Sequence, residues 1–203
     1  YLGANPEQAQ NYFVRAMTID PNNISIRFNL GVAQQALGQF KEALLTYKEV
    51  VHSKSDYTDA YYNMGNVLKE MQEYEAAISN YDKCLAVDAN YIDAHYNKSI
   101  TLQHLGDTKA AIASLQESIK KKPNDPRALT NLGLLSKTFS TIQDAKQYFQ
   151  AAIDVDNFYK EAYFHLGDLH LEQNEPRNAV CFYAKAIRID PKYEAAYLNI
   201  STS

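Results

Sequence analysis

Tryptophan is absent from this chain of 203 residues, and cysteine, glycine and proline are scarce, with two, seven and six copies. The two cysteines, Cys84 and Cys181, lie 97 residues apart, and neither belongs to a CxxC motif or a Cys/His ligand pattern. They therefore exclude a disulfide framework and fit a reducing compartment. We expect the protein to be intracellular, and cytoplasmic before any other location.

A large excess of one charge is also missing. The chain has 20 basic and 24 acidic residues and a net charge of −4. A nucleic-acid binder needs clustered Lys and Arg to displace counterions from phosphates, so we expect no nucleic-acid partner. The densest basic run, residues 120–122, stands at the end of a predicted helix, where it complements the helix dipole. No run of 18 apolar residues occurs, so we expect no membrane insertion.

What the chain does have is an internal repeat of 34 residues. An alanine recurs at this interval without an insertion or deletion: Ala9, Ala43, Ala77, Ala111, Ala145 and Ala179. A large apolar residue follows each alanine four positions later: Phe13, Tyr47, Tyr81, Leu115, Phe149 and Tyr183. A small residue stands twelve positions before five of the alanines: Gly31, Gly65, Ser99, Gly133 and Gly167. Small residues at a close helix–helix approach, with a large group beside them, indicate one packing unit used repeatedly.

Each unit reads as two amphipathic helices. Residues 59–71 and 75–87 show apolar groups at spacings of three and four, which form a stripe on one face of each helix. Gly38 and Gly106 fall in the turns between helices, where glycine adopts a positive φ without steric cost. One hairpin cannot bury both of its faces, so neighbouring units must stack. We expect first helices near residues 25–37, 59–71, 93–105, 127–138 and 161–173.

These units resemble the tetratricopeptide repeat family. Two motifs carry the resemblance: Tyr61-x-x-Met64-Gly65-x-x-Leu68 and Ala77-x-x-x-Tyr81-x-x-Cys84. The resemblance implies an all-α fold, a right-handed α-solenoid of helix-turn-helix repeats that forms a single array over residues 1–203. We expect complete repeats at 24–57, 58–91, 92–125, 126–159 and 160–193, with partial repeats at 1–23 and 194–203. Neither end has a polar capping helix, so we expect further repeats or self-association through the exposed ends.

In this family the first helix of each hairpin lines an inner groove, and the register identifies the matching positions. Most regular is an asparagine series, with His165 in its one gap and Asn66 beside it: Asn29, Asn63, Asn97, Asn131 and Asn199. Asparagine donates and accepts hydrogen bonds, so such a ladder can bind the backbone of an extended peptide. The resemblance adds that O-GlcNAc transferase and the peroxisomal targeting-signal receptor use such ladders. The alternative is that asparagine, common in the family here, only fills an exposed face.

Aromatic and charged residues accompany the ladder. Tyr62, Tyr96 and Phe164 offer apolar anchors to a ligand. The charges are mixed, with Lys69, Arg127 and Lys137 basic and Asp168 among the acidic residues. The C-terminal third of the groove is the more acidic, which suits a partner segment that carries Lys or Arg.

Two other activities of known proteins are disfavoured. Family members that bind the C-terminal carboxylate of a heat-shock protein use three cations and two asparagines, but here Tyr62 and Asn131 replace two of the cations. His165 shares a helical face with Glu161 and Asp168, yet a zinc site needs more His or Cys. No phosphate loop and no nucleophile motif occurs. We therefore expect no enzymatic activity, no metal and no cofactor.

Two functions remain. The first is a scaffold that binds an extended peptide or a helix of a partner protein in its groove. The second is architectural, as a subunit of a large multiprotein assembly. Beside these two stands a third option, the substrate-selecting arm of an O-GlcNAc-transferase-like enzyme whose catalytic domain lies elsewhere. Residues expected on the outer face do not decide between them, because Cys181 and Phe182 are apolar whereas Asn80 and Lys83 are polar.

Lys98 breaks the repeat pattern. Its place is held by leucine in the next two units, at Leu132 and Leu166. An unpaired buried ammonium group is too unfavourable to persist. We expect Lys98 to reach solvent or to meet a carboxylate.

Overall fold

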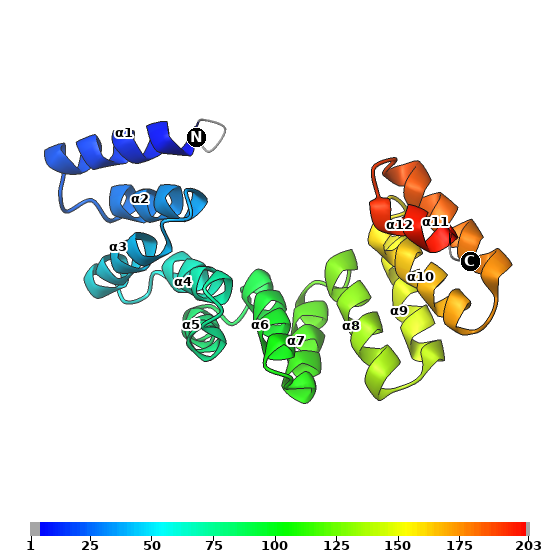
Figure 1. Cartoon of the computed structure of the whole chain (residues 1–203). Coiled ribbons are helices and arrows are strands. Elements are labelled where there is room, and N and C mark those ends of the chain that lie inside the picture. Colours follow the sequence, from blue (N-terminus) through cyan, green and yellow to red (C-terminus); the bar gives the residue numbers. More distant parts are fainter. Residues whose placement is uncertain (1–4, 202–203) are drawn as a thin grey trace. The chain divides into compact units, whose positions relative to one another are not determined.

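The computed structural model describes residues 5–201, and within this range the chain forms twelve α-helices and no strand (Figure 1). The first six helices are α1 (Pro6–Ile19), α2 (Ile24–Ala36), α3 (Phe40–Ser53), α4 (Thr58–Glu70), α5 (Tyr74–Val87) and α6 (Ile92–His104). The others are α7 (Thr108–Lys121), α8 (Pro126–Phe139), α9 (Ile142–Val155), α10 (Lys160–Glu172), α11 (Pro176–Ile189) and α12 (Glu194–Ser201). The predicted all-α fold is confirmed, and each first helix begins one residue before its expected start.

The chain divides into two compact units, residues 1–114 and 115–203, which are described separately. In the first unit α2 packs against α1 and α3, α4 against α3 and α5, and α5 against α6. In the second unit α9 packs against α8 and α10, and α11 against α10 and α12. Packing between sequence neighbours is the mark of a solenoid of helical hairpins. The single array over all 203 residues stays a prediction, and residues 1–4 and 202–203 of its partial repeats lie outside the described range.

The turns inside the hairpins share one backbone feature. A positive φ recurs every 34 residues, at Gly38 (72°), Gln72 (62°), Gly106 (77°) and Asn174 (58°). This confirms the prediction for the two glycines, which adopt the left-handed region without the cost that a Cβ brings. Ser140 holds the same place before α9 with φ −134°. There Thr141 and Asp144 form a reciprocal capping box that starts the helix instead.

In four of the hairpins the core is an aromatic ring packed against a glycine. Tyr81 is wholly buried, and its Cε1 would lie 2.5 Å from a Cβ placed on Gly65. The same arrangement joins Gly31 to Tyr47, Gly133 to Phe149 and Gly167 to Tyr183. The glycine therefore creates the space that the ring fills, and the ring excludes water from the seam between the two helices.

Both cysteines are free. Cys84 is buried in the first unit, and burial raises the pKa of its thiol to about 12, so the thiol stays protonated and unreactive. Cys181 is exposed on α11. None of the helices in the described range is long and apolar enough to cross a membrane.

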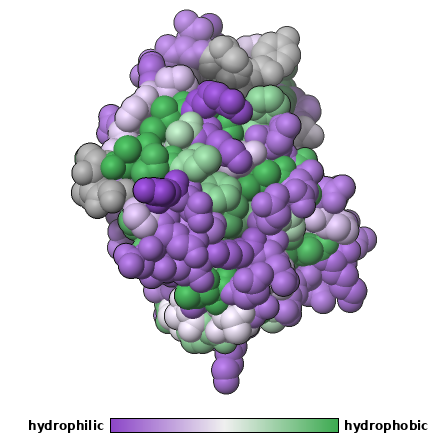
Figure 2. Space-filling view, turned by 90° about the vertical axis from the view of Figure 1, so that its right-hand side faces the viewer, coloured by the Kyte–Doolittle hydropathy of each residue, from purple (hydrophilic) through white to green (hydrophobic). Residues whose placement is uncertain are grey.

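The second unit exposes apolar surface near its C-terminal end. Green apolar areas lie between purple polar ones in the view that faces the right-hand side of Figure 1 (Figure 2). On α12, Tyr197 is 50% exposed and Leu198 is 67% exposed. Exposed apolar side chains of this size fit the expectation of further packing there, but self-association stays a prediction.

Lys98 of α6 forms an ion pair with Asp82 of α5, which confirms that it meets a carboxylate. The Lys98 side chain is 22% exposed and that of Asp82 is 53% exposed, so the pair lies at the edge of the seam. Partly exposed ion pairs contribute little to stability, typically about 0–1 kcal/mol.

Replacing Lys98 with leucine, the residue at the equivalent positions, should therefore leave the free energy of unfolding unchanged or raise it by up to about 1 kcal/mol. Chemical denaturation of Lys98→Leu beside the parent chain measures this. Asp82→Asn, which removes the same ion pair without adding apolar surface, is the matched control. A loss of stability above about 1 kcal/mol in Lys98→Leu alone would show that the ammonium group is needed for more than its ion pair.

Candidate functional site

All of the predicted groove residues lie on the first helices of the hairpins or on α12. The set in the first unit is Asn29 of α2, Tyr62, Asn63, Asn66 and Lys69 of α4, and Tyr96 and Asn97 of α6. The set in the second unit is Arg127, Asn131 and Lys137 of α8, Phe164, His165 and Asp168 of α10, and Asn199 of α12. We call the first set the N-terminal face and the second the C-terminal face. Asn29, Arg127 and Lys137 are exposed and the rest are half-buried, so every member reaches the surface.

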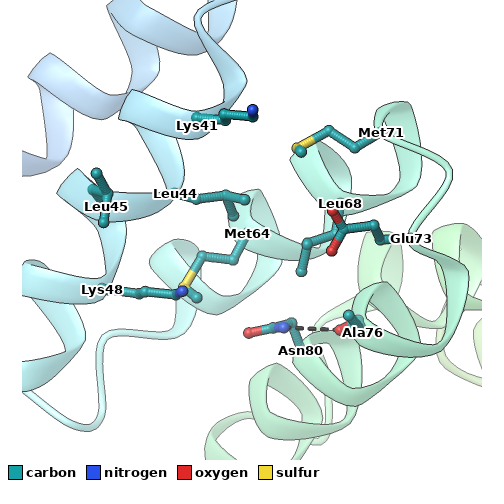
Figure 3. Close-up of a pocket in the computed structure, with 10 residues that line it drawn as sticks. All are labelled: Lys41, Leu44, Leu45, Lys48, Met64, Leu68, Met71, Glu73, Ala76 and Asn80. Atoms are coloured by element: carbon teal, nitrogen blue, oxygen red, sulfur yellow. Dashed lines mark hydrogen bonds between the residues drawn. The ribbon is translucent and has the colours of Figure 1, made fainter.

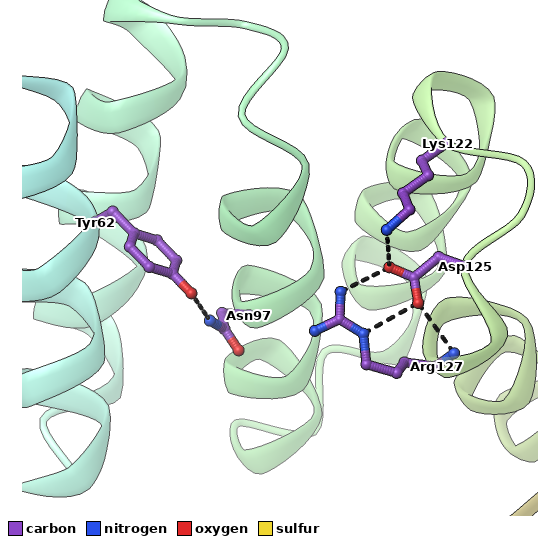
Figure 4. Close-up of polar contacts among 5 residues, drawn as sticks. All are labelled: Tyr62, Asn97, Lys122, Asp125 and Arg127. Atoms are coloured by element: carbon purple, nitrogen blue, oxygen red, sulfur yellow. Dashed lines mark hydrogen bonds and ion pairs between the residues drawn. The ribbon is translucent and has the colours of Figure 1, made fainter. Parts of the chain in front are cut away.

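A hydrogen-bonded triad organises the N-terminal face. The Nδ2 of Asn97 donates to the hydroxyl of Tyr62 at 2.8 Å (Figure 4). The same Nδ2 donates to Oδ1 of Asn66 at 3.1 Å. The hydroxyl of Tyr81, at the seam below, donates to the same Oδ1 of Asn66 at 2.8 Å. Both N–H donors of Asn97 are thus used inside the protein. Its Oδ1 receives no hydrogen bond from the described residues and stays available as an acceptor.

The C-terminal face repeats this arrangement with an aspartate in the central place. The Tyr183 hydroxyl donates to Oδ1 of Asp168 at 2.8 Å, and Nδ2 of Asn199 donates to that oxygen at 2.9 Å. Burial and the hydrogen bond to Asp168 raise the pKa of Tyr183 to about 12. Each triad therefore ties the asparagine of one repeat to the first and second helices of the repeat before it.

The other members of the ladder have different partners. Asn29 donates to the carbonyl of Ser25 in its own helix at 2.9 Å. Tyr47 donates to Gln35 at 2.9 Å; burial raises the pKa of Tyr47, and the amide of Asn63 beside the hydroxyl opposes part of that rise. His165 stacks on Phe149, which has no hydroxyl to accept from an asparagine, with ring centroids 5.5 Å apart. Residues at this one repeat position therefore have different hydrogen-bond or packing partners in different repeats.

The aromatic residues of the faces pack on tyrosines that the sequence analysis did not single out. Tyr62 lies 4.9 Å from Tyr91 between ring centroids, and Phe164 lies 5.3 Å from Tyr193. The Tyr91 hydroxyl also donates to Asp59 at 2.8 Å; burial, and then this bond, raise the pKa of Tyr91. Tyrosine ends four repeats, at Tyr57, Tyr91, Tyr159 and Tyr193. That 34-residue spacing was the signal that could have revealed them.

The remaining repeat, at 92–125, ends in Asp125 instead, and its carboxylate is only 1% exposed. Arg127 donates to it from its backbone N at 3.1 Å, Nε at 3.0 Å and Nη2 at 2.7 Å, and Lys122 lies 3.7 Å away (Figure 4). Burial alone would raise the pKa of Asp125, but the hydrogen bonds and charge of Arg127, with the charge of Lys122, outweigh it and lower the pKa.

The remaining cations of the two faces also have acidic neighbours. Lys137 forms an ion pair with Glu172, and Lys69 lies 3.9 Å from Glu70. His165 lies 3.4 Å from Asp168. Within residues 5–201, no group of three or more His, Cys, Asp or Glu is arranged to hold a metal ion. The chemistry that the faces offer is hydrogen bonding and aromatic contact.

Comparison with known proteins gives one consistent result. Family models described as tetratricopeptide repeat match residues 4–66, 58–91, 92–125 and 141–194. A search of curated protein sequences gives no significant match.

Solved structures share the fold at low identity. PilF of Pseudomonas aeruginosa is 19% identical with a TM-score of 0.81, over 98% of this chain and 90% of its own. MamA from Desulfovibrio magneticus RS-1 is 23% identical with a TM-score of 0.73, over 84% and 97%. YrrB, described as a TPR protein with an unusual peptide-binding site, is 22% identical with a TM-score of 0.69, over 92% and 96%. The 34-residue register, the glycine–aromatic seams and the four family matches lead to one conclusion: the chain belongs to the tetratricopeptide repeat family and has the architecture of a protein-interaction scaffold.

Proposed function

We propose that this protein is a non-catalytic scaffold that binds an extended peptide or a helix of a partner protein along the faces of its first helices. The observation that carries the proposal is the triad of Tyr62, Asn66 and Asn97. It holds polar and aromatic side chains in fixed positions on a half-exposed surface. Side chains that are fixed before binding lose less conformational entropy when a ligand arrives.

The triad also narrows what a ligand must offer. Since both donors of Asn97 are engaged, the free Oδ1 suits a backbone N–H of the ligand rather than a carbonyl. Tyr62 presents an aromatic surface beside it, which suits an apolar side chain. On the C-terminal face, Asp168 and Glu172 favour a ligand segment with Lys or Arg.

The test uses a peptide selected from a random library against the unmodified chain. Asn97→Ala should weaken its binding by about tenfold or more, because a ligand N–H then loses its acceptor. Fluorescence anisotropy measures the affinity. Thermal melts run in parallel, because Asn97→Ala also removes two internal hydrogen bonds and should lower stability by about 1–2 kcal/mol.

Tyr81→Phe is the matched control. It removes the hydrogen bond that the Tyr81 hydroxyl donates to Asn66, which lies in the buried seam and not at the surface. It should lower stability to a similar degree and leave the affinity within about twofold of the parent. Equal affinities for the parent and a folded Asn97→Ala variant would contradict the peptide-binding function and favour an architectural role.

A further inference from the structure

A second surface of the first unit is a cleft between α3 and α5 (Figure 3). Both helices are second helices of their hairpins, and α4 packs against each of them and forms the floor. The cleft has a volume of about 500 Å³ and contains no residue of the N-terminal face. It is therefore a surface separate from the one proposed above.

The lining of the cleft is apolar in its centre. Met64 and Leu68 of α4, with Met71 directly after its end, form the floor, and Leu44 and Leu45 of α3 form one wall. Leu45 is 63% exposed, which is unusual for a large aliphatic side chain at a concave site. Methionine side chains are flexible and adapt to the shape of an incoming apolar surface.

The α3 wall is basic. Lys41 and Lys48 are seven residues apart, so they lie on one side of the helix two turns from each other. In the part of the chain that the structure describes, neither lysine forms a hydrogen bond or an ion pair. Glu73 on the opposite wall gives the cleft one basic and one acidic side. The cleft therefore offers an apolar floor and two unpaired cations, which suit a ligand that has both apolar and acidic groups.

Asn80 of α5, in the lining of the cleft, has a buried acceptor without a partner. Asn80 was expected on the outer face, but it is only 7% exposed. Its Nδ2 donates to the carbonyl of Ala76 at 2.8 Å, whereas its Oδ1 is buried without a partner and points away from Ala76 toward the α3 side (Figure 3). Thr46, one repeat earlier, is satisfied by Gln34 at 2.7 Å. A buried acceptor without a donor is rare in folded proteins and calls for an explanation.

We propose that this cleft binds an amphipathic helix of a partner protein, with its apolar side on the methionines and leucines and its acidic side chains against Lys41 and Lys48. A helix in an apolar groove is a recurring mode of protein recognition. The two lysines, spaced by two turns, match acidic residues spaced by two turns on the bound helix. A basic helix of the same shape meets repulsion from Lys41 and Lys48 and finds one acidic residue, Glu73, in the lining.

The test uses two synthetic helical peptides with the same leucine face, one flanked by glutamates and one by lysines. The acidic peptide should bind the whole chain about tenfold more tightly than the basic one, as expected for two ion pairs at a partly desolvated surface. In the variant Lys41→Glu/Lys48→Glu this preference should be reversed. Isothermal titration gives the affinities.

The control is Lys83→Glu/Lys109→Glu, which changes the net charge equally at exposed lysines outside the cleft. It should keep the preference for the acidic peptide, because neither of these lysines lines the cleft. Absence of binding, equal affinity for both peptides, or equal loss in the control variant overturns the proposal. A dimer of the parent chain that Lys41→Glu/Lys48→Glu abolishes would assign the cleft to a second copy and also overturn it.

Discussion

Replacing Gly65 with alanine should destabilise the first unit by about 1–3 kcal/mol, although alanine is the better helix former by about 1 kcal/mol. The added methyl group would lie 2.5 Å from Cε1 and 2.7 Å from Cδ1 of Tyr81. This ring is rigid and wholly buried, so it cannot turn aside without breaking the packing of the seam. Chemical denaturation followed by circular dichroism measures the loss.

A double-mutant cycle with Tyr81→Leu is the control for Gly65→Ala. The smaller leucine side chain removes the clash. Gly65→Ala should therefore lower the free energy of unfolding much less in the Tyr81→Leu background than in the parent chain. The repeat at 92–125 already has such a combination. Ser99, which is larger than glycine, stands at the position of Gly65, and Leu115, which is smaller than tyrosine, stands at the position of Tyr81. If Gly65→Ala lowers the free energy of unfolding equally in both backgrounds, the contact between the glycine and the aromatic ring does not determine how the two helices pack.

Replacing Asp125 with alanine should lower the stability of the second unit by about 2 kcal/mol. The carboxylate caps the N-terminus of α8 through the backbone N of Arg127 and also accepts from its guanidinium group. Alanine leaves the helix end uncapped and removes the acceptor of both interactions. Asp125→Asn keeps a capping oxygen and should cost less. Equal losses for the two substitutions would show that the charge, and not the cap, holds the α8 terminus.

The stabilisation by Asp125 should depend on pH. Its pKa is lower in the folded chain than in the unfolded one, so the unfolded state binds the proton more tightly. The contribution is complete above the unfolded pKa of about 4 and disappears as the pH falls through the folded pKa. The stability difference between the parent and Asp125→Asn should therefore be constant near neutral pH and shrink below about pH 4.

Much of the fold could be predicted because the repeat is in unbroken register. The small residue at Gly65 and the ring at Tyr81 recur 16 positions apart in successive repeats. This spacing predicted which residues pack between the two helices, and the repeat register predicted the start of each first helix to within one residue. The turn at Gly38 could be predicted for the same reason. The positive φ at Gln72 was missed because residue type does not favour it there, and only the register with Gly38 implies it.

Less of the site could be predicted, because hydrogen bonds depend on distances across a seam that sequence spacing does not supply. The asparagine pattern predicted a groove position for Asn97, but it did not predict the hydrogen bonds of Asn97 to Tyr62 and Asn66. Asn80 was expected to face solvent, because a polar residue on an outward position is normally exposed. It is buried instead, in the lining of the cleft between α3 and α5. Periodicity gives the direction of a side chain but not what covers it.

The central claim is that the partner peptide lies along the first helices, and site-specific photo-crosslinking tests it most directly. A photoreactive amino acid replaces Lys69 on α4, within the N-terminal face, or Lys83 on α5, outside both the face and the cleft. The peptide selected for the groove experiment is then irradiated with each variant. The account predicts a crosslinked product from position 69 and none from position 83. Crosslinking at position 83 with none at position 69 would contradict it.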